Sequence, residues 1–158
     1  MHVKRRSKLV YHIALLLLTA GLFAGSVQAM RSESMTLHTA RGPQVIRVEI
    51  TETMEEKARG LMFRMRLPDG EGMLFGYDPP REITMWMRNT LIPLDMVFIR
   101  SDGVVHRIEA STHPLSEEII ASRGDVAACL ELAGGAAERM GLKPGDWVEH
   151  PLFTPRKK

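Results

Sequence analysis

Apolar and polar side chains alternate along residues 83–88, and this short stretch gives the clearest view of how the chain folds. A period of two places successive side chains on opposite faces of a β-strand. Met85 and Met87 would therefore face one way, and Trp86 and Arg88 the other. The pattern predicts a strand that buries its methionines and presents a tryptophan and an arginine together.

Further strands are predicted on both sides of this segment. They are expected within 36–50, as two strands around a turn at 40–43, and at 73–75, 94–99, 104–110, 126–132 and 147–150. Asp102 and Gly103 predict a two-residue hairpin turn that pairs Ser101 with Val104. A five-residue corner at 89–93 would set Asp95 opposite Met87, and a slip of one residue would set it opposite Trp86.

The period changes between residues 54 and 65, where apolar residues recur at helical spacing. Thr53 followed by Glu56 is a capping box, and basic residues at 64 and 66 would complement the helix dipole. The pattern predicts an amphipathic helix that runs past Gly60, a residue that costs about 1 kcal/mol there and suggests a close contact or an early break. A second, short helix is expected at 135–141.

These elements predict a mainly β (α+β) fold. We expect a single compact antiparallel β-sandwich or jelly-roll-like domain over 36–153, with one main amphipathic helix and a short C-terminal helix. Residues 30–35 would form a mobile N-terminal segment, and 154–158 a basic tail.

Four short motifs follow one another in the chain: Gly60-Leu61-Met62-Phe63-Arg64, Gly72-Met73-Leu74-Phe75, Met85-Trp86-Met87-Arg88-Asn89-Thr90 and Ile92-Pro93-Leu94-Asp95. With Asp102-Gly103 and Gly145-Asp146, they resemble the family called domain of unknown function 192, also known as uncharacterised protein family 0127. The resemblance covers roughly residues 35–152. It implies a compact, β-rich, jelly-roll-like domain with one main helix, often behind an export signal. The family has no established activity, so the resemblance implies none.

Residues 1–29 have the three parts of a secretory signal peptide: a basic start, an apolar run over 9–24 and small residues before position 30. The sequence therefore predicts a periplasmic or secreted protein. A retained anchor is the second choice, because the apolar run is shorter than the roughly 20 residues of a spanning helix. Arg5 and Arg6 leave the twin-arginine route open beside the general one.

Export changes the charge of the chain. The sequence contains 21 Lys and Arg against 19 Asp and Glu, and four of the basic residues lie in the signal. The mature chain would carry 17 basic and 19 acidic side chains, a net charge of −2. This composition does not favour nucleic acid as a partner. The single cysteine, Cys129, lies in an apolar run and predicts a buried, inert thiol.

Asp95 and His106 are the best candidates for a catalytic pair, but the predicted hairpin keeps them apart. Four strand residues separate their positions, which corresponds to about 13 Å. A base and its orienting group need hydrogen-bond contact. The predicted register therefore gives no catalytic pair.

Several methionines could offer thioether sulfurs to Cu(I), namely Met62, Met65, Met73, Met85 and Met87. Each occupies a position where any large apolar residue would serve packing, so core filling is the preferred interpretation. We predict no metal and no cofactor.

A polar cluster around the central strand is the candidate binding site: Trp86, Arg88, Asn89, Thr90 and Asp95, with Arg64 in support. Tryptophan offers a flat apolar surface, arginine a planar fork of donors and asparagine both donors and acceptors. The alternative is structural. Asn89 and Thr90 would then cap a tight corner, and Asp95 would form a buried salt bridge with Arg88 or Arg64.

We expect an exported module of the cell envelope that binds a small polar ligand, such as a carbohydrate or an anion. One alternative is a small periplasmic enzyme with Asp95 as acid or base and Arg88 stabilising an anion. Another is a module that binds a protein of the envelope. After cleavage of the signal, stable membrane insertion is not expected.

Overall fold

The computed structural model describes residues 30–154. Its strands are β1 (Ser32–Thr39), β2 (Gly42–Thr51), β3 (Glu71–Arg81), β4 (Thr84–Met85), β5 (Leu94–Ile99), β6 (Val105–Glu109), β7 (Ile120–Ala121), β8 (Val126–Ala133) and β9 (Trp147–Glu149). Its helices are α1 (Met54–Arg59) and α2 (Ala136–Met140). None of the helices described is long and apolar enough to cross a membrane. The predicted signal peptide lies outside the described residues.

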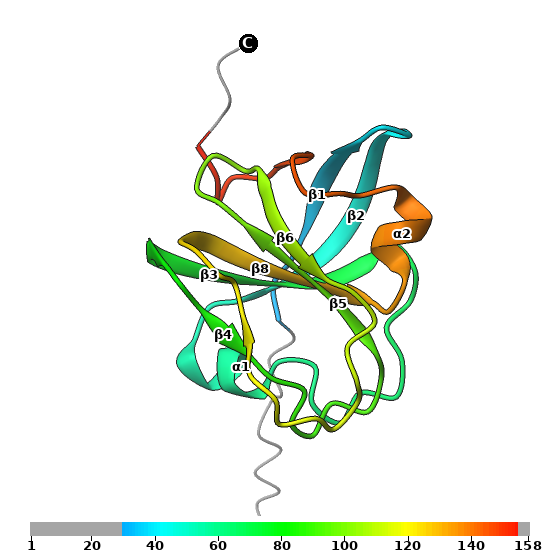
Figure 1. Cartoon of the computed structure of the whole chain (residues 1–158), viewed down its shortest axis with the longest axis vertical. Helices are drawn as coiled ribbons and strands as arrows, with labels where there is room; N and C mark the ends of the chain where they lie inside the picture. The colour runs from blue at the N-terminus through cyan, green and yellow to red at the C-terminus, as the bar shows by residue number, and fades with distance from the viewer. Residues whose placement is uncertain (1–29, 155–158) are drawn as a thin grey trace, which may run out of the picture.

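Seven strands form one curled sheet in the order β6-β5-β8-β3-β2-β1-β9, and β4 pairs with β7 in a second, small sheet (Figure 1). Neighbours in the large sheet are antiparallel except β2 and β3, which are parallel. The two edges of the curled sheet meet, because the amide of Val105 donates to Asp146 and that of Val148 donates to Gly103, both at 2.8 Å. The predicted β-rich fold with two helices is confirmed, in a mixed sheet rather than an antiparallel one.

The curled sheet has an apolar core on each face. On β8, Leu130 and Leu132 join the core on one face, whereas Cys129 joins the other. The second core also receives Leu61 from the segment after α1 and Met87 from the segment after β4. The helix α1 and the β4–β7 pair therefore lie on this second face (Figure 1). Cys129 is a fully buried member of the second core.

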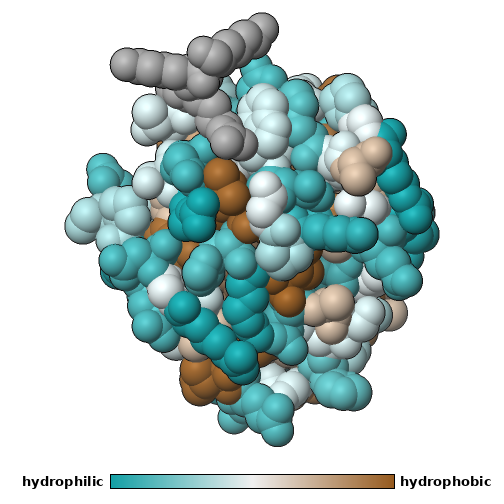
Figure 2. Space-filling view, turned by 45° about the horizontal axis from the view of Figure 1, so that its top comes forward, coloured by the Kyte–Doolittle hydropathy of each residue, from teal (hydrophilic) through white to brown (hydrophobic). Residues whose placement is uncertain are grey.

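Hydrophilic side chains dominate the surface shown in Figure 2, and apolar residues appear there as small separate patches. Among the described residues, several large apolar side chains are nevertheless exposed near α1 and β4, including Phe63 and Trp86. These two residues belong to the region that holds the candidate site.

The main helix begins as predicted but is shorter. The capping box of Thr53 and Glu56 is present, which confirms the helix start. The helix ends at Arg59 because Gly60 adopts a φ of 46°, a left-handed value that favours glycine. The predicted continuation through residue 65 is wrong, and Met65 is 79% exposed instead of packed in a helical stripe.

The predicted hairpin between residues 83–88 and 94–99 is also wrong. Thr84 of β4 pairs with Ala121 of β7, and β5 lies between β6 and β8 in the large sheet. Asp95 is therefore opposite neither Met87 nor Trp86. The predicted alternation still holds in burial, since Met87 is buried and Trp86 exposed.

Two further details differ from the prediction. The turn at Asp102 is one residue longer than a two-residue hairpin: Arg100 donates to Val104, and Ile99 pairs with Val105. The first strand begins at Ser32, so residues 32–35 belong to the sheet and are not a mobile segment.

Candidate functional site

A pocket opens beside Trp86, between α1, β3 and the segment that follows β4. Trp86 is 44% exposed, and the guanidinium carbon of Arg88 lies 5.5 Å from the centre of its indole ring. The two side chains therefore do share a face, as the alternation predicts, even though the regular strand ends at Met85. We call this cavity the Trp86 pocket.

The Trp86 pocket draws its lining from four separate parts of the chain and has a volume of about 110 Å³. Ligand pockets for drug-sized molecules are about 300–1,000 Å³, so this one suits a much smaller group. Its lining residues are Lys57, Ala58, Arg59, Gly60, Leu61, Met62, Phe75, Tyr77, Thr84, Met85, Trp86, Arg88, Thr90 and Glu131.

Glu131 is the unusual member of this lining. It lies in the middle of β8, paired with Met73 of β3 on one side and with Met96 of β5 on the other. It is only 4% exposed, and its Oε2 atom has no hydrogen-bond partner among the described residues. A carboxyl group thus faces the pocket from an apolar sheet without a protein partner.

Burial decides the protonation of this carboxyl group. Desolvation raises the pKa of Glu131 from 4.5 to about 8, and the positive charge of Arg64 opposes this only in part. An ionised carboxylate without a partner in an apolar setting is far more costly than a neutral carboxyl. Glu131 is therefore mainly protonated at neutral pH, and presents an O–H donor as well as an acceptor.

Cationic side chains accompany this neutral carboxyl group. Lys57 and Arg59 enter the lining from α1, and Arg88 from the segment after β4. Lys57 donates to the carbonyl of Gly76, and its Nζ atom lies 5.1 Å from the centre of the Tyr77 ring. The charged lining is thus positive overall, which favours an anionic or electron-rich ligand.

Three loops meet beside the pocket in an uncommon backbone conformation. Phe63, Asn89 and Leu115 have φ values of 63°, 56° and 64°, in the left-handed region that side chains other than glycine rarely adopt. Hydrogen bonds connect these loops: the amide of Phe63 donates to Asn89 at 2.9 Å, and that of Leu115 donates to Thr90 at 3.0 Å. Such strain is commonly found at functional sites.

Only half of the six predicted site residues line the Trp86 pocket. Trp86, Arg88 and Thr90 line the Trp86 pocket. Asn89 is not among the lining residues, but the Nδ2 atom of its side chain lies 3.8 Å from the sulfur of Met62, which does line the pocket. Asn89 therefore contacts a residue of the pocket wall without lining the pocket itself.

Asp95 lies elsewhere, and its predicted roles are wrong. It is fully buried at the start of β5, where its carboxylate accepts hydrogen bonds from the amides of Ser111, Gly135 and Ala137 at 2.8–2.9 Å. These bonds tie two loops and the start of α2 to the sheet. Asp95 forms no salt bridge with Arg88, and a carboxylate engaged in this way is not an acid or base for the pocket.

Arg64 is also outside the pocket lining. Its guanidinium makes a two-pronged ion pair with Glu49 of β2, and this pair raises the pKa of Arg64. The predicted salt bridge with Asp95 is therefore absent. Arg64 influences the site only through its charge, which opposes part of the rise that burial causes in the pKa of Glu131.

The candidate copper ligands lie in different settings, and two of them, Met62 and Met85, line the Trp86 pocket. Met73 and Met87 are fully buried in the core, whereas Met65 is exposed. Met85 accepts a contact of 3.7 Å from the hydroxyl of Tyr77. Within residues 30–154, no three His, Cys, Asp or Glu side chains gather in a way that could hold a metal ion.

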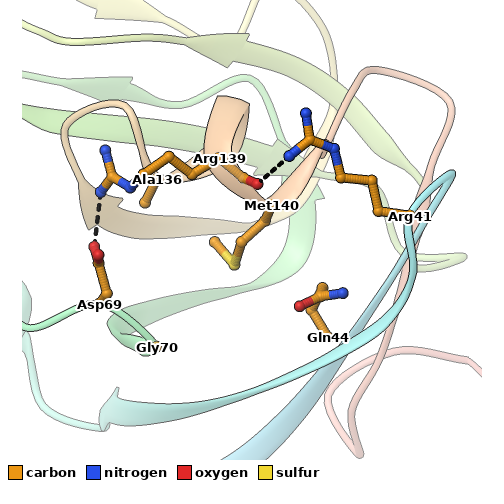
Figure 3. A pocket seen from close by; sticks show the side chains of 7 residues that line it. All are labelled: Arg41, Gln44, Asp69, Gly70, Ala136, Arg139 and Met140. Carbon is orange, nitrogen blue, oxygen red and sulfur yellow. Dashed lines mark hydrogen bonds and ion pairs between the residues drawn. The ribbon is translucent and has the colours of Figure 1, made fainter.

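A second, larger hollow of about 340 Å³ lies beside α2 (Figure 3). Its charged residues already bind one another: Arg139 donates to Asp69 at 2.7 Å, and Arg41 donates to the carbonyl of Arg139 at 2.6 Å. Both Arg139 and Asp69 are more than half exposed. With its polar groups paired and near solvent, this hollow is a weaker candidate than the Trp86 pocket.

Sequence reasoning missed Glu131, Lys57 and Tyr77. One signal was present for Glu131, because it is the single charged residue in the otherwise apolar strand Val126–Ala133. A charge in such a run is expected to be either paired or functional. Lys57 and Tyr77 carry no comparable signal, since both residue types are ordinary where they stand.

The sequence profile of the DUF192 family, described as uncharacterized ACR, matches residues 36–150. This chain belongs to the DUF192 family. Comparison with curated proteins gives no match.

Two solved structures resemble this DUF192 protein. One, from Sinorhizobium meliloti 1021, is described as a candidate transcription regulator; it is 40% identical, has a TM-score of 0.76, and the match covers 79% of this chain and 98% of that one. The other is a protein of unknown function from Novosphingobium aromaticivorans DSM 12444. It is 43% identical, has a TM-score of 0.76, and the match covers 79% of this chain and 89% of that one.

Proposed function

We propose that this DUF192 protein is a binding module for a small polar ligand, and that the Trp86 pocket is its binding site. We place it in the cell envelope, as a periplasmic or secreted protein, on the basis of the signal-like sequence at residues 1–29. The predicted residues Trp86, Arg88 and Thr90 belong to this site, and Lys57, Tyr77 and Glu131 are added to it.

The observation that carries the proposal is the unpaired carboxyl of Glu131. Buried polar groups in proteins almost always have hydrogen-bond partners, and leaving one unpaired costs about 1–3 kcal/mol. Glu131 faces a pocket whose mouth presents Trp86 and Arg88. A ligand in the pocket would supply the missing partner, so the cost in the free protein would be recovered on binding.

A thermal-shift screen tests this function. The purified protein is heated with small organic acids, amides, amines and monosaccharides. A ligand present at about one hundred times its Kd stabilises the folded state by about 2.7 kcal/mol, which corresponds to a rise in Tm of several degrees.

Two arginine variants show whether such a rise comes from the pocket. Arg88→Ala removes a lining side chain that is 53% exposed, and Arg100→Ala removes an arginine that is 46% exposed and paired with Asp102 outside the lining. We expect the rise in Tm to persist in Arg100→Ala and to fall sharply in Arg88→Ala. Equal rises in both variants would place the ligand elsewhere.

A further inference from the structure

The carboxyl group of Glu131, at the bottom of the Trp86 pocket, has an oxygen atom without a hydrogen-bond partner. Glu131 is enclosed by Met73 and Met96 in the sheet, and its Oε2 atom meets no polar partner within residues 30–154. In such surroundings the neutral form of a carboxyl is strongly preferred to the ionised form. A neutral carboxyl brings an O–H to the pocket, and this O–H requires an acceptor from the ligand.

The mouth of the pocket supplies positive charge that the protein does not neutralise well. The Nε atom of Arg88 lies 3.7 Å from the nearest carboxylate oxygen, on Glu117, which is too long for a hydrogen bond. Both of these side chains are more than half exposed, so their attraction is weak. The planar fork of Arg88, which lies near the ring of Trp86, is thus available to a ligand.

We propose that the Trp86 pocket binds a carboxylate, which accepts a hydrogen bond from the buried carboxyl of Glu131 and pairs with the guanidinium of Arg88. This assignment rests on the binding function proposed above and names its ligand class. One oxygen of the carboxylate meets the donor at the floor, and the other meets the arginine at the mouth. The indole of Trp86 covers the carbon atoms that follow.

Other ligand classes fit these groups less well. A cation would have to approach past Lys57, Arg59 and Arg88. A neutral amide could accept a hydrogen bond from Glu131, but it has no negative charge to pair with the guanidinium of Arg88. A pocket of about 110 Å³ admits a small planar group rather than a large one. The carboxylate could belong to a free organic acid or to an acidic side chain of a peptide.

The protonation of Glu131 makes this binding dependent on pH. The charged and titratable side chains that share the pocket or interact with this carboxyl are Lys57, Arg59, Arg64, Tyr77, Arg88 and Cys129. Burial raises the pKa of Tyr77 to about 12 and also raises that of Cys129, so both keep their protons in mildly alkaline solution. Ionisation of Glu131 would remove the donor and place a second negative charge beside the ligand.

Acetate, acetamide and methylammonium are three small probes that separate these classes. Each is titrated into the ¹⁵N-labelled protein at pH about 6.5 and about 9.5, on either side of the ionisation of Glu131 and far above that of acetate. The indole N–H signal of Trp86 reports on the pocket, and that of Trp147, in β9, serves as the internal control. A peptide with one aspartate and blocked ends is titrated in parallel.

We expect acetate to shift the Trp86 signal and to bind at least tenfold more weakly at the higher pH. Glu131→Gln keeps a neutral donor, so it should bind acetate with little dependence on pH. Glu131→Met removes the donor and should lose binding. Tighter binding of the peptide would identify a protein chain as the source, whereas tighter binding of acetate would identify a free acid; either result supports the carboxylate.

Two results overturn the carboxylate but leave the binding function intact: stronger binding of acetamide or methylammonium at Trp86, or acetate binding that is equal at both pH values in the wild type. If no probe shifts the Trp86 signal and no compound of the thermal screen raises Tm through Arg88, both proposals fail together.

Discussion

Replacing Glu131 by glutamine should change how the stability of the protein depends on pH. In the unfolded chain this carboxyl ionises at its ordinary pKa of 4.5, whereas in the folded protein it keeps its proton up to about 8. Between these values the folded state binds one proton more than the unfolded state. The stabilising contribution is therefore complete below about pH 4.5 and is lost as the pH rises towards 8, by about 1.4 kcal/mol per pH unit.

Glutamine has nearly the same shape and does not ionise in this range. The free energy of unfolding of the wild type, relative to that of Glu131→Gln, should fall by roughly 3 kcal/mol between pH about 5 and about 7. Other titrating groups are common to both proteins, so their contributions to the pH dependence cancel in the difference. Urea denaturation followed by tryptophan fluorescence at several pH values measures it.

The matched control is Glu55→Gln, which alters an exposed glutamate on α1. Its difference in stability from the wild type should change by much less than about 3 kcal/mol between pH about 5 and about 7. If the curves for the wild type and Glu131→Gln run parallel instead, the carboxyl of Glu131 is not held in its neutral form by burial, and the reasoning about the floor of the pocket is refuted.

Three other substitutions test the supports of the site by urea denaturation. Asp95→Asn should cost about 3 kcal/mol, because an amide cannot accept all three buried backbone hydrogen bonds; a loss below about 1 kcal/mol would contradict the assigned role. Gly60→Ala should cost about 1–2 kcal/mol, since φ is 46° and the added methyl would lie 3.1 Å from the Phe75 ring; an unchanged midpoint would contradict it. Thr53→Ala should cost about 1 kcal/mol by removing the helix cap, whereas Thr53→Ser should cost little; equal losses would argue against capping.

Local patterns in the sequence predicted local structure well. The capping box at Thr53 marks the true start of α1. The alternation around Met87 correctly separates buried from exposed side chains. These features depend on residues within a few positions of one another, so a single stretch of sequence contains the information.

Pairing between distant strands could not be read in the same way. The segment around Thr84 joins β7, far along the chain, rather than its neighbour β5, and nothing in its own alternation distinguishes these partners. The predicted length of α1 was wrong for a related reason. Helical spacing continues past Gly60, but the backbone conformation of that glycine ends the helix.

The same limit explains which parts of the site were found. Trp86 and Arg88 share a face because of local geometry, so their proximity was predictable. Glu131 reaches the pocket only through the pairing of β8 with β3 and β5. Asp95 was misplaced because its three backbone partners lie 16 to 42 residues away in sequence.

A ¹³C NMR titration of the Glu131 side-chain carboxyl, assigned by comparison with Glu131→Gln, tests most directly whether this group is neutral in the pocket. We expect a midpoint near 8 in the free protein, and a higher midpoint when acetate is present, because acetate would bind the protonated form. A midpoint near 4.5, the ordinary value for glutamate, would contradict the claim that this pocket contains a neutral carboxyl group able to donate a hydrogen bond to a ligand.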